Sequence, residues 1–288
     1  MVYKFAFGGW RLKLLRNAMS VEYKVDWWSV FREILSSHSP EKIRFPSVSL
    51  VKEEDGFGFF RIGEREFYFP LSFYSQSLLG FIYWEVFDRK VYEGGNCLIQ
   101  PGDWVVDAGA CEGFFSLYAL EKGANVLVFE PIPELAKALE MTLKKYIDEG
   151  RAKVFPLGLG SRNASVEMFV SRKSVISSSF SKDKIDYLKE EWLDFERKIL
   201  RVAPLDELLR SNLLPPISFI KADVEGYERE LLLGASEVIR RYKPRLSICT
   251  YHLPDDYIEI PKIVEGFGLN YKIILKVHGN TLSIMHAW

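Results

Sequence analysis

Val105-Val106-Asp107-Ala108-Gly109-Ala110-Cys111-Glu112-Gly113-Phe114-Phe115 is the stretch that decides the fold of this 288-residue chain. It begins with apolar, β-branched residues typical of a buried strand, and Gly109 and Gly113 mark a tight turn before a helical segment over 114–122. A strand, a glycine turn and a helix in this order open a βαβ unit, and open α/β sheets bind ligands at such a turn. The stretch therefore predicts both a fold class and the place of a site.

The same alternation continues toward the C-terminus. Further strands are expected over 126–129, 154–157, 217–222 and 246–250, and a β segment over 166–170. Helices are expected over 133–146, 227–241 and 257–267. Strands that alternate with helices of this length indicate right-handed crossovers and a doubly wound, mostly parallel α/β sheet. A closing hairpin over 271–277 and 282–285 adds one antiparallel strand, so seven strands are predicted.

Residues before about Asn96 follow another pattern, rich in aromatic side chains. We expect residues 1–84 to form an N-terminal α+β extension that caps the substrate side, and residues 85–288 to form the main domain. Within the extension, 59–69 predicts a hairpin that turns at Gly63. Helices are expected over 78–92 and over 21–36, the latter with its inward face formed by Val25, Trp28, Val30 and Ile34. The polar stretch 171–200 is expected to be an inserted loop or lid.

Composition excludes several classes of protein. The chain is 48% hydrophobic and 27% charged, as in soluble globular proteins. Lys and Arg (38) balance Asp and Glu (39), so no binding to double-stranded nucleic acid is expected. Three separated cysteines without a Cys/His cluster argue against a disulfide scaffold or a structural zinc site. No apolar run of transmembrane length and no secretory signal are legible, so we expect a cytoplasmic protein without membrane association.

A carboxylate after the second strand identifies the ligand class. Glu130 stands 21 residues after Gly109, where it can accept hydrogen bonds from both ribose hydroxyls of an adenosine. The glycine spacing differs from the dinucleotide pattern, and Asp107 and Glu112 would repel a diphosphate. The same carboxylates favour a ligand that carries an ammonium and a sulfonium. S-adenosylmethionine fits these residues, and NAD does not.

Four segments together resemble the FkbM family of S-adenosylmethionine-dependent methyltransferases. They are 107–113, 129–131, 204–208 and 220–228, of which the last, Lys-x-Asp-x-Glu-Gly-x-Glu, is the most distinctive. The resemblance extends over about residues 85–288. It implies a Rossmann-like class I methyltransferase that acts on a hydroxyl of a small molecule, sugar or glycan. The absence of an Asp/Asn-Pro-Pro-Tyr/Phe motif after the fourth strand agrees with a hydroxyl rather than an amino acceptor.

The resemblance also implies a set of cofactor-binding residues. Asp107, Gly109 and Gly113 would surround the methionine portion, and Glu130 would hold the ribose. The full set implied for S-adenosylmethionine is Asp107, Ala108, Gly109, Gly113, Glu130, Pro131 and Asp223.

Three residues are candidates for catalysis: Asp223, Glu225 and His252. All lie at or just beyond the carboxyl ends of predicted strands. An unperturbed imidazole pKa makes His252 the best base near neutrality. Asp223, closer to the cofactor, is placed to orient either the acceptor or the sulfonium. Asp223 and Glu225 also suit the first turn of a helix, and together could bind a divalent ion, although no metal site is expected.

Three alternatives remain open at this point. One is an NAD-dependent oxidoreductase, and another is a catalytically silent methyltransferase fold that serves as a binding module. Methylation of RNA or protein is the third, with the near-neutral charge arguing against RNA.

Overall fold

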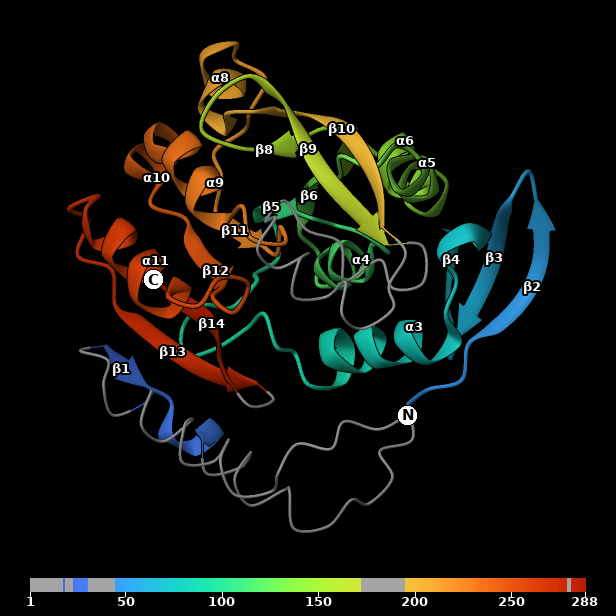
Figure 1. Ribbon diagram of the computed structural model, residues 1–288, viewed down its shortest axis with the longest axis horizontal. Coiled ribbons are helices and arrows are strands. Elements are labelled where there is room, and N and C mark those ends of the chain that lie inside the picture. The colour runs from blue at the N-terminus through green and yellow to red at the C-terminus, as the bar shows by residue number, and fades with distance from the viewer. Residues whose placement is uncertain (1–17, 19–22, 31–44, 172–194, 279–280) are drawn as a thin grey trace.

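The computed structural model describes residues 18, 23–30, 45–171, 195–278 and 281–288 (Figure 1). The strands of its central sheet are β1 (Lys24–Val25), β5 (Trp104–Ala108), β6 (Asn125–Phe129), β7 (Ala152–Phe155), β11 (Phe219–Ala222), β12 (Arg245–Cys249), β13 (Ile273–His278) and β14 (Thr281–Ala287). Their order is β1-β13-β14-β12-β11-β5-β6-β7. β14 runs antiparallel to both of its neighbours, and the other pairs are parallel. The predicted mostly parallel α/β sheet with one antiparallel strand is confirmed, and β1 adds an eighth strand at its edge.

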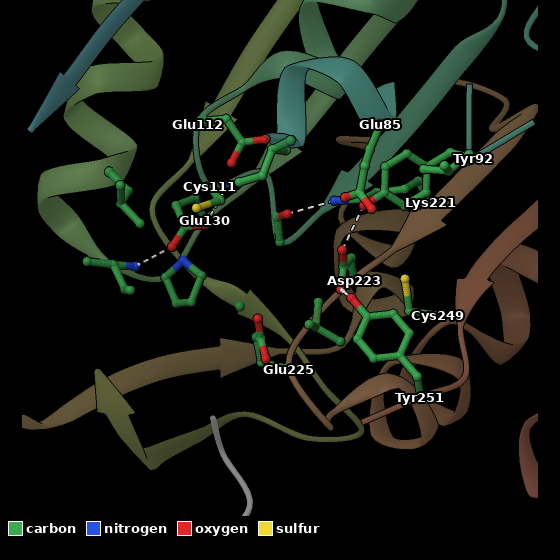
Figure 2. A pocket seen from close by; sticks show the side chains of 18 of the residues that line it. Glu85, Tyr92, Cys111, Glu112, Glu130, Lys221, Asp223, Glu225, Cys249 and Tyr251 are labelled. Atoms are coloured by element: carbon green, nitrogen blue, oxygen red, sulfur yellow. Dashed lines mark hydrogen bonds between the residues drawn. The ribbon is translucent and has the colours of Figure 1, made fainter. Parts of the chain in front are cut away.

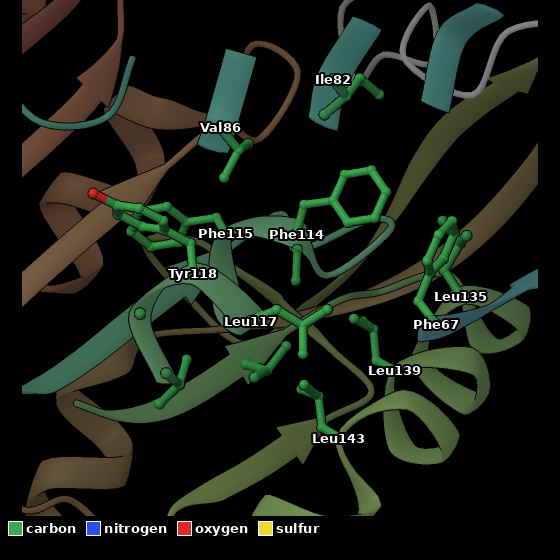
Figure 3. Packing of buried hydrophobic residues seen from close by; sticks show 14 of the residues in the cluster. Phe67, Ile82, Val86, Phe114, Phe115, Leu117, Tyr118, Leu135, Leu139 and Leu143 are labelled. Carbon is green, nitrogen blue, oxygen red and sulfur yellow. The ribbon is translucent and has the colours of Figure 1, made fainter. Parts of the chain in front are cut away.

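Helices cover both faces of this sheet. They are α4 (Phe114–Glu121), α5 (Pro133–Thr142), α6 (Lys144–Asp148), α8 (Leu205–Arg210), α9 (Glu228–Gly234), α10 (Ser236–Tyr242) and α11 (Asp256–Glu265). α4 and α5 pack on one face, in the apolar cluster of Figure 3. α8 to α11 pack on the opposite face in a second cluster. The segments 133–146 and 227–241, each predicted as one helix, are each divided into two.

Strand alternation decides where the charged strand residues point. Val105 packs in the cluster on the α4 face and Val106 in the cluster on the other face. Because side chains alternate along a strand, Asp107 faces α4. The same alternation in β11 places Lys221 on the face of Phe219, and Lys221 is the direct cross-strand neighbour of Asp107.

The N-terminal region adds a second sheet and a helix. Its antiparallel strands are β2 (Ser49–Glu54), β3 (Phe57–Ile62) and β4 (Arg65–Pro70), which confirm the predicted hairpin and its turn at Gly63. Phe67 of β4 packs edge to face on Phe114 of α4, with ring centroids 4.9 Å apart. After a short turn, η1 (Leu71–Phe73), α3 (Gln76–Tyr83) continues into the π-helical η2 (Trp84–Asp88). α3 and η2 together run across residue 84 without a break. The domain boundary expected between residues 84 and 85 stays a prediction.

The helix predicted over 21–36 is wrong in its first part. Residues 24–25 form β1, and helical residues begin at Trp27. The reason is a local cap: the Asp26 carboxylate accepts the backbone N–H groups of Trp28 (3.1 Å) and Ser29 (3.3 Å), which starts the helix after residue 26. Val25 and Val30 are buried as predicted, but Trp28 is 73% exposed. Residues 31–36, including Ile34, lie outside the described residues.

The predicted insertion over 171–200 is partly strand. A third sheet, in the order β8-β10-β9, comprises β8 (Gly158–Leu159), β9 (Ala164–Ser171) and β10 (Phe195–Ala203). β10, a strand that was not predicted from the sequence, pairs antiparallel with β9 along its length. Residues 172–194, the middle of the predicted loop, lie outside the described residues. In the described part of the chain, no helix is long and apolar enough to cross a lipid bilayer.

Candidate active site

A cavity of about 350 Å³ opens at the carboxyl ends of β5, β6, β11 and β12 (Figure 2). Five of the predicted site residues line it: Gly109, Glu130, Pro131, Asp223 and Glu225. Four others, Asp107, Ala108, Gly113 and His252, are not among the lining residues. The topology therefore brings residues that are more than a hundred positions apart in the sequence into one site.

Gly109 brings the two sides of the cavity into backbone contact. Its φ is +74°, and a Cβ atom built there would lie 1.9 Å from the carbonyl oxygen of Asp223. No side chain fits in that space, so the turn after β5 requires glycine. Gly113 has another role, since a Cβ there would lie 2.6 Å from Leu139 of α5. Gly113 permits close packing of the helices behind the cavity.

Glu130 presents a buried carboxylate at the tip of β6. It is 4% exposed, and its two oxygens accept the backbone N–H groups of Cys111 (3.0 Å) and Ile132 (2.9 Å). Burial raises the pKa of Glu130 to about 7, against the opposing effect of these two amides. Because each carboxylate oxygen has a second lone pair, both can still accept a hydroxyl group.

Asp107 forms an ion pair behind the cavity instead of lining it. Its carboxylate is fully buried and accepts the Ser116 hydroxyl (2.6 Å) and the Lys221 ammonium (3.0 Å). Lys221 also donates to the carbonyl oxygens of Gly109 (2.7 Å) and Ala108 (3.4 Å). Although burial opposes the charge of Lys221, Asp107 and Asp223 hold its pKa above the usual value. The pair thus fixes the end of β5, and the Lys221 donors are already engaged.

Glu112 is a lining residue that the set of predicted contacts did not include. Its side chain is on the same loop as Cys111, and the residue is only 8% exposed. Burial raises the pKa of Glu112 to about 7, and Lys221 only partly offsets this rise. The turn after β5 therefore places a second carboxyl group on the same wall as Glu130.

Asp223 lies at the centre of the opposite wall, as Figure 2 shows. Its two oxygens accept the hydroxyl groups of Tyr92 (2.7 Å) and Tyr251 (3.2 Å). Burial disfavours its charge, but Lys221 and the His252 ring outweigh burial and keep the pKa of Asp223 below its ordinary value. Asp223 is therefore ionised at neutral pH and held in one orientation.

His252 supports this wall from behind. Its side chain is 1% exposed, and Nδ1 lies 2.8 Å from the Glu228 carboxylate. Nε2 lies 3.5 Å from Asp223 and 3.4 Å from Glu225. Burial opposes protonation, yet Glu228 and Glu225 raise the pKa of His252 to about 9. The expected ordinary imidazole pKa is therefore wrong, and a ring protonated at pH 7 cannot accept a proton there.

One group of possible metal ligands occurs among the described residues. Asp223, Glu228 and His252 each offer an atom, and these atoms lie within 4.8 Å of one another. Glu228, however, already accepts the backbone N–H groups of Val224 (2.9 Å) and Gly226 (3.1 Å) besides facing His252. These partners thus satisfy the carboxylate of Glu228 without a bound metal ion.

Several lining residues carried no recognisable signal in the sequence. Tyr92 is 131 residues from Asp223, and nothing in the local pattern around it predicts their contact. Tyr251 directly precedes His252, so the prediction of His252 as a site residue could have been extended to Tyr251. Phe81, Ile82 and Glu85, from α3 and η2, border the cavity through tertiary packing alone.

Comparisons with known proteins identify relatives of this chain. The family model of the methyltransferase FkbM domain matches residues 107–277. The 31-O-demethyl-FK506 methyltransferase FkbM of Streptomyces tacrolimicus is 26% identical over 178 residues, covering 54% of this chain and 68% of that protein. The AMB antimetabolite synthetase AmbE of Pseudomonas aeruginosa is 27% identical over 187 residues, covering 54% of this chain but 9% of the synthetase.

A solved structure shares the fold. It is the methyltransferase FkbM from Methylobacillus flagellatus KT, with a TM-score of 0.51 and 22% sequence identity. The match covers 72% of this chain and 48% of that chain. The family match begins at Asp107, so the N-terminal region and the segments of α3 and η2 that border the cavity lie outside it.

Proposed function

The chain belongs to the FkbM methyltransferase family, and from that premise we propose that it transfers the methyl group of S-adenosylmethionine to a hydroxyl of a small molecule, sugar or glycan. One observation carries the cofactor assignment: the buried Glu130 carboxylate at the tip of β6, beside the glycine turn of β5. A carboxylate at this position suits the two hydroxyl groups of a ribose.

The charge of the cavity supports a cationic nucleoside over a dinucleotide. Its acidic lining residues are Glu85, Glu112, Glu130, Asp223 and Glu225. In the described lining the one cation is Lys221, and its ammonium already donates to Asp107 and two backbone carbonyls. A diphosphate would therefore meet carboxylates without a free cation. A sulfonium and an ammonium would meet favourable charge.

We assign the contacts with the cofactor partly to side chains and partly to the backbone. S-adenosylmethionine supplies, when bound, a methyl group activated by its sulfonium. Glu130 would hold the ribose, and Pro131 and Leu159, which line the same wall, would flank the base. Gly109 lets the ligand approach the main chain. Asp107, Ala108 and Gly113 would act from behind, by fixing Lys221 and the start of α4.

Asp223 is the residue we assign to the acceptor hydroxyl. It would accept the hydrogen bond of that hydroxyl and take its proton as the new bond forms. An alcohol oxygen becomes strongly acidic as it gains a methyl group, so a carboxylate of low pKa is a sufficient base. Glu225 would border the acceptor, and His252, protonated behind both carboxylates, would position them.

Two observations support a hydroxyl-bearing small acceptor. The name of the relative from Streptomyces tacrolimicus describes methylation of 31-O-demethyl-FK506, which places the reaction of that protein at an oxygen. In this chain, Phe81 and Ile82 of α3 border the cavity, in support of the N-terminal region as a cap over the acceptor. Aromatic side chains at the mouth of a site pack well on sugars and planar acceptors.

Calorimetry and a labelling experiment test the proposal. We expect micromolar-range binding of S-adenosylhomocysteine and none of NADH. Labelled S-adenosylmethionine with fractionated cell extract should yield a labelled product, identified by mass spectrometry. Binding of NADH instead would support an oxidoreductase, and cofactor binding without any labelled product would support a silent binding module.

Asp223→Asn tests the acceptor assignment within the same assay. We expect transfer to fall by about 100-fold or more, the usual contribution of a positioned acid or base. Binding of S-adenosylhomocysteine should change by less than about fivefold, because Glu130 and the glycine turn remain intact. A variant that keeps its transfer rate would remove Asp223 from the reaction.

A further inference from the structure

The amino-acid end of the proposed cofactor needs a partner for its ammonium group. The family resemblance implies that Asp107, with Gly109 and Gly113, surrounds the methionine portion, and Asp107 is the acidic residue among them. In the structure that carboxylate has no exposed surface, and it already binds Lys221 and Ser116. An ammonium group in the cavity cannot reach it without breaking this buried pair.

Glu112 has the properties that Asp107 lacks. It lines the cavity and is only 8% exposed. Its own backbone amide and the Cys111 thiol, both within the same turn, favour the ionised form of this carboxylate and lower its pKa, against the larger effect of burial. The described residues place no lysine, arginine or histidine within ion-pair distance of it. A buried carboxylate without a cationic partner is costly, and a ligand cation would offset that cost.

The charged groups around Glu112 are known. Lys221, on β11, and Asp107, on β5, act on it with opposite sign. Lys221 is committed to Asp107 and to two backbone carbonyls, so it does not neutralise Glu112. Glu130, on the same wall, is bound to the backbone beside Pro131, at the end proposed for the ribose. Asp223 and Glu225 belong to the wall proposed for the acceptor, and Glu85 comes from η2. Glu112 is thus the second carboxylate beside the glycine turn, where the amino-acid chain of the ligand is proposed to lie.

We infer that Glu112 binds the α-ammonium group of the methionine portion of the cofactor, in the place first given to Asp107. This assignment rests on the proposed function. It makes the site selective for nucleosides that carry the amino-acid chain, because a ligand without an ammonium group leaves Glu112 uncompensated.

Two ligands separate the inference from its premise. S-adenosylhomocysteine carries the ammonium group, and 5′-methylthioadenosine shares the nucleoside and the thioether but lacks the amino-acid chain. By calorimetry, Glu112→Gln should weaken S-adenosylhomocysteine about tenfold, as expected for the loss of a charge-assisted hydrogen bond. Its affinity for 5′-methylthioadenosine should stay within about twofold of the unchanged protein. Glu130→Gln should weaken both ligands.

Asp107→Asn is the matched control, because it neutralises the neighbouring carboxylate. It should lower the melting temperature, because the buried charge of Lys221 loses its partner. It should not selectively weaken the affinity for S-adenosylhomocysteine. Glu112→Gln should keep or raise the melting temperature, which shows that the variant is folded. A selective loss in Asp107→Asn, or equal effects of Glu112→Gln on both ligands, would overturn the inference. If the unchanged protein binds neither ligand, the proposed function itself fails.

Discussion

Two walls of one cavity treat buried carboxyl groups in opposite ways. On the β5–β6 wall, Glu112 and Glu130 are buried without a cation of their own, and burial raises the pKa of each to about 7. On the β11–β12 wall, Asp223 is surrounded by Lys221, His252 and two tyrosine hydroxyls, and its pKa is lowered.

The difference teaches which wall depends on a ligand. The β11–β12 wall satisfies its charges from within the protein, so its geometry is set before any ligand arrives. The β5–β6 wall is incomplete, since its two carboxyl groups form no ion pair with the described residues, and a bound cationic molecule would supply the missing charge. We interpret the first wall as the one that positions the acceptor and the second as the one that captures the cofactor.

Lys221→Met should have the largest effect, because it removes the cation that the β11–β12 wall shares with Asp107. Loss of one partner from a buried pair leaves an uncompensated charge, and we expect the free energy of unfolding to fall by about 3–5 kcal/mol. Urea denaturation measures this change. The double variant Asp107→Asn with Lys221→Met should recover much of the loss. A loss below about 1 kcal/mol in the single variant would refute the account of a self-neutralised wall.

Glu130→Ala should have a smaller effect, confined to binding. We expect the binding free energy of S-adenosylhomocysteine to weaken by about 1–2 kcal/mol, through the loss of charge-assisted hydrogen bonds to the ribose. Calorimetry measures the affinity, with a denaturation curve to show that the variant folds. Unchanged affinity would reject the ribose assignment and, with it, the contrast between the walls.

The pH dependence of binding should show the smallest effect. A ribose hydroxyl donates to the ionised form of Glu130, whose pKa in the free protein is about 7. Lowering the pH through 7 protonates this group, so binding should weaken up to about tenfold from pH 8 to pH 6. Titrations of 5′-methylthioadenosine, which lacks the ammonium group assigned to Glu112, at several pH values test the sign for Glu130 alone. An affinity that rises as pH falls would contradict the ionised-carboxylate model.

Much of the architecture could be predicted because it follows from local pattern. Apolar runs, glycine turns and helical segments alternate from residue 104 onward, and parallel crossovers then decide the strand order. β1 was missed because two residues, Lys24 and Val25, show no alternation and pair only through tertiary contact with β13. Trp28 was misplaced because the Asp26 cap, rather than the hydrophobic pattern, sets the start of its helix.

The candidate site was harder to predict, because the spacing of residues in the sequence does not show where a side chain points or which charged groups surround it in the fold. The sequence places Asp107 at a strand end, but strand alternation turns its side chain toward α4 and Ser116. The ordinary pKa expected for His252 ignored Glu228, which lies 24 residues earlier and meets the ring only in the folded chain. Tyr92 comes from a region with no recognisable motif.

The bare backbone contact at Gly109 has a consequence for how such an enzyme can diversify. The main chain of that turn lies so close to the carbonyl oxygen of Asp223 that the two loops, which we propose to hold donor and acceptor, meet through their backbones. Under the proposed function, the backbone contact would set the distance between donor and acceptor independently of the side chains that select the acceptor. We would then expect variants of lining residues such as Phe81 and Glu85 to change which acceptor is used, while the backbone contact at Gly109 keeps its spacing.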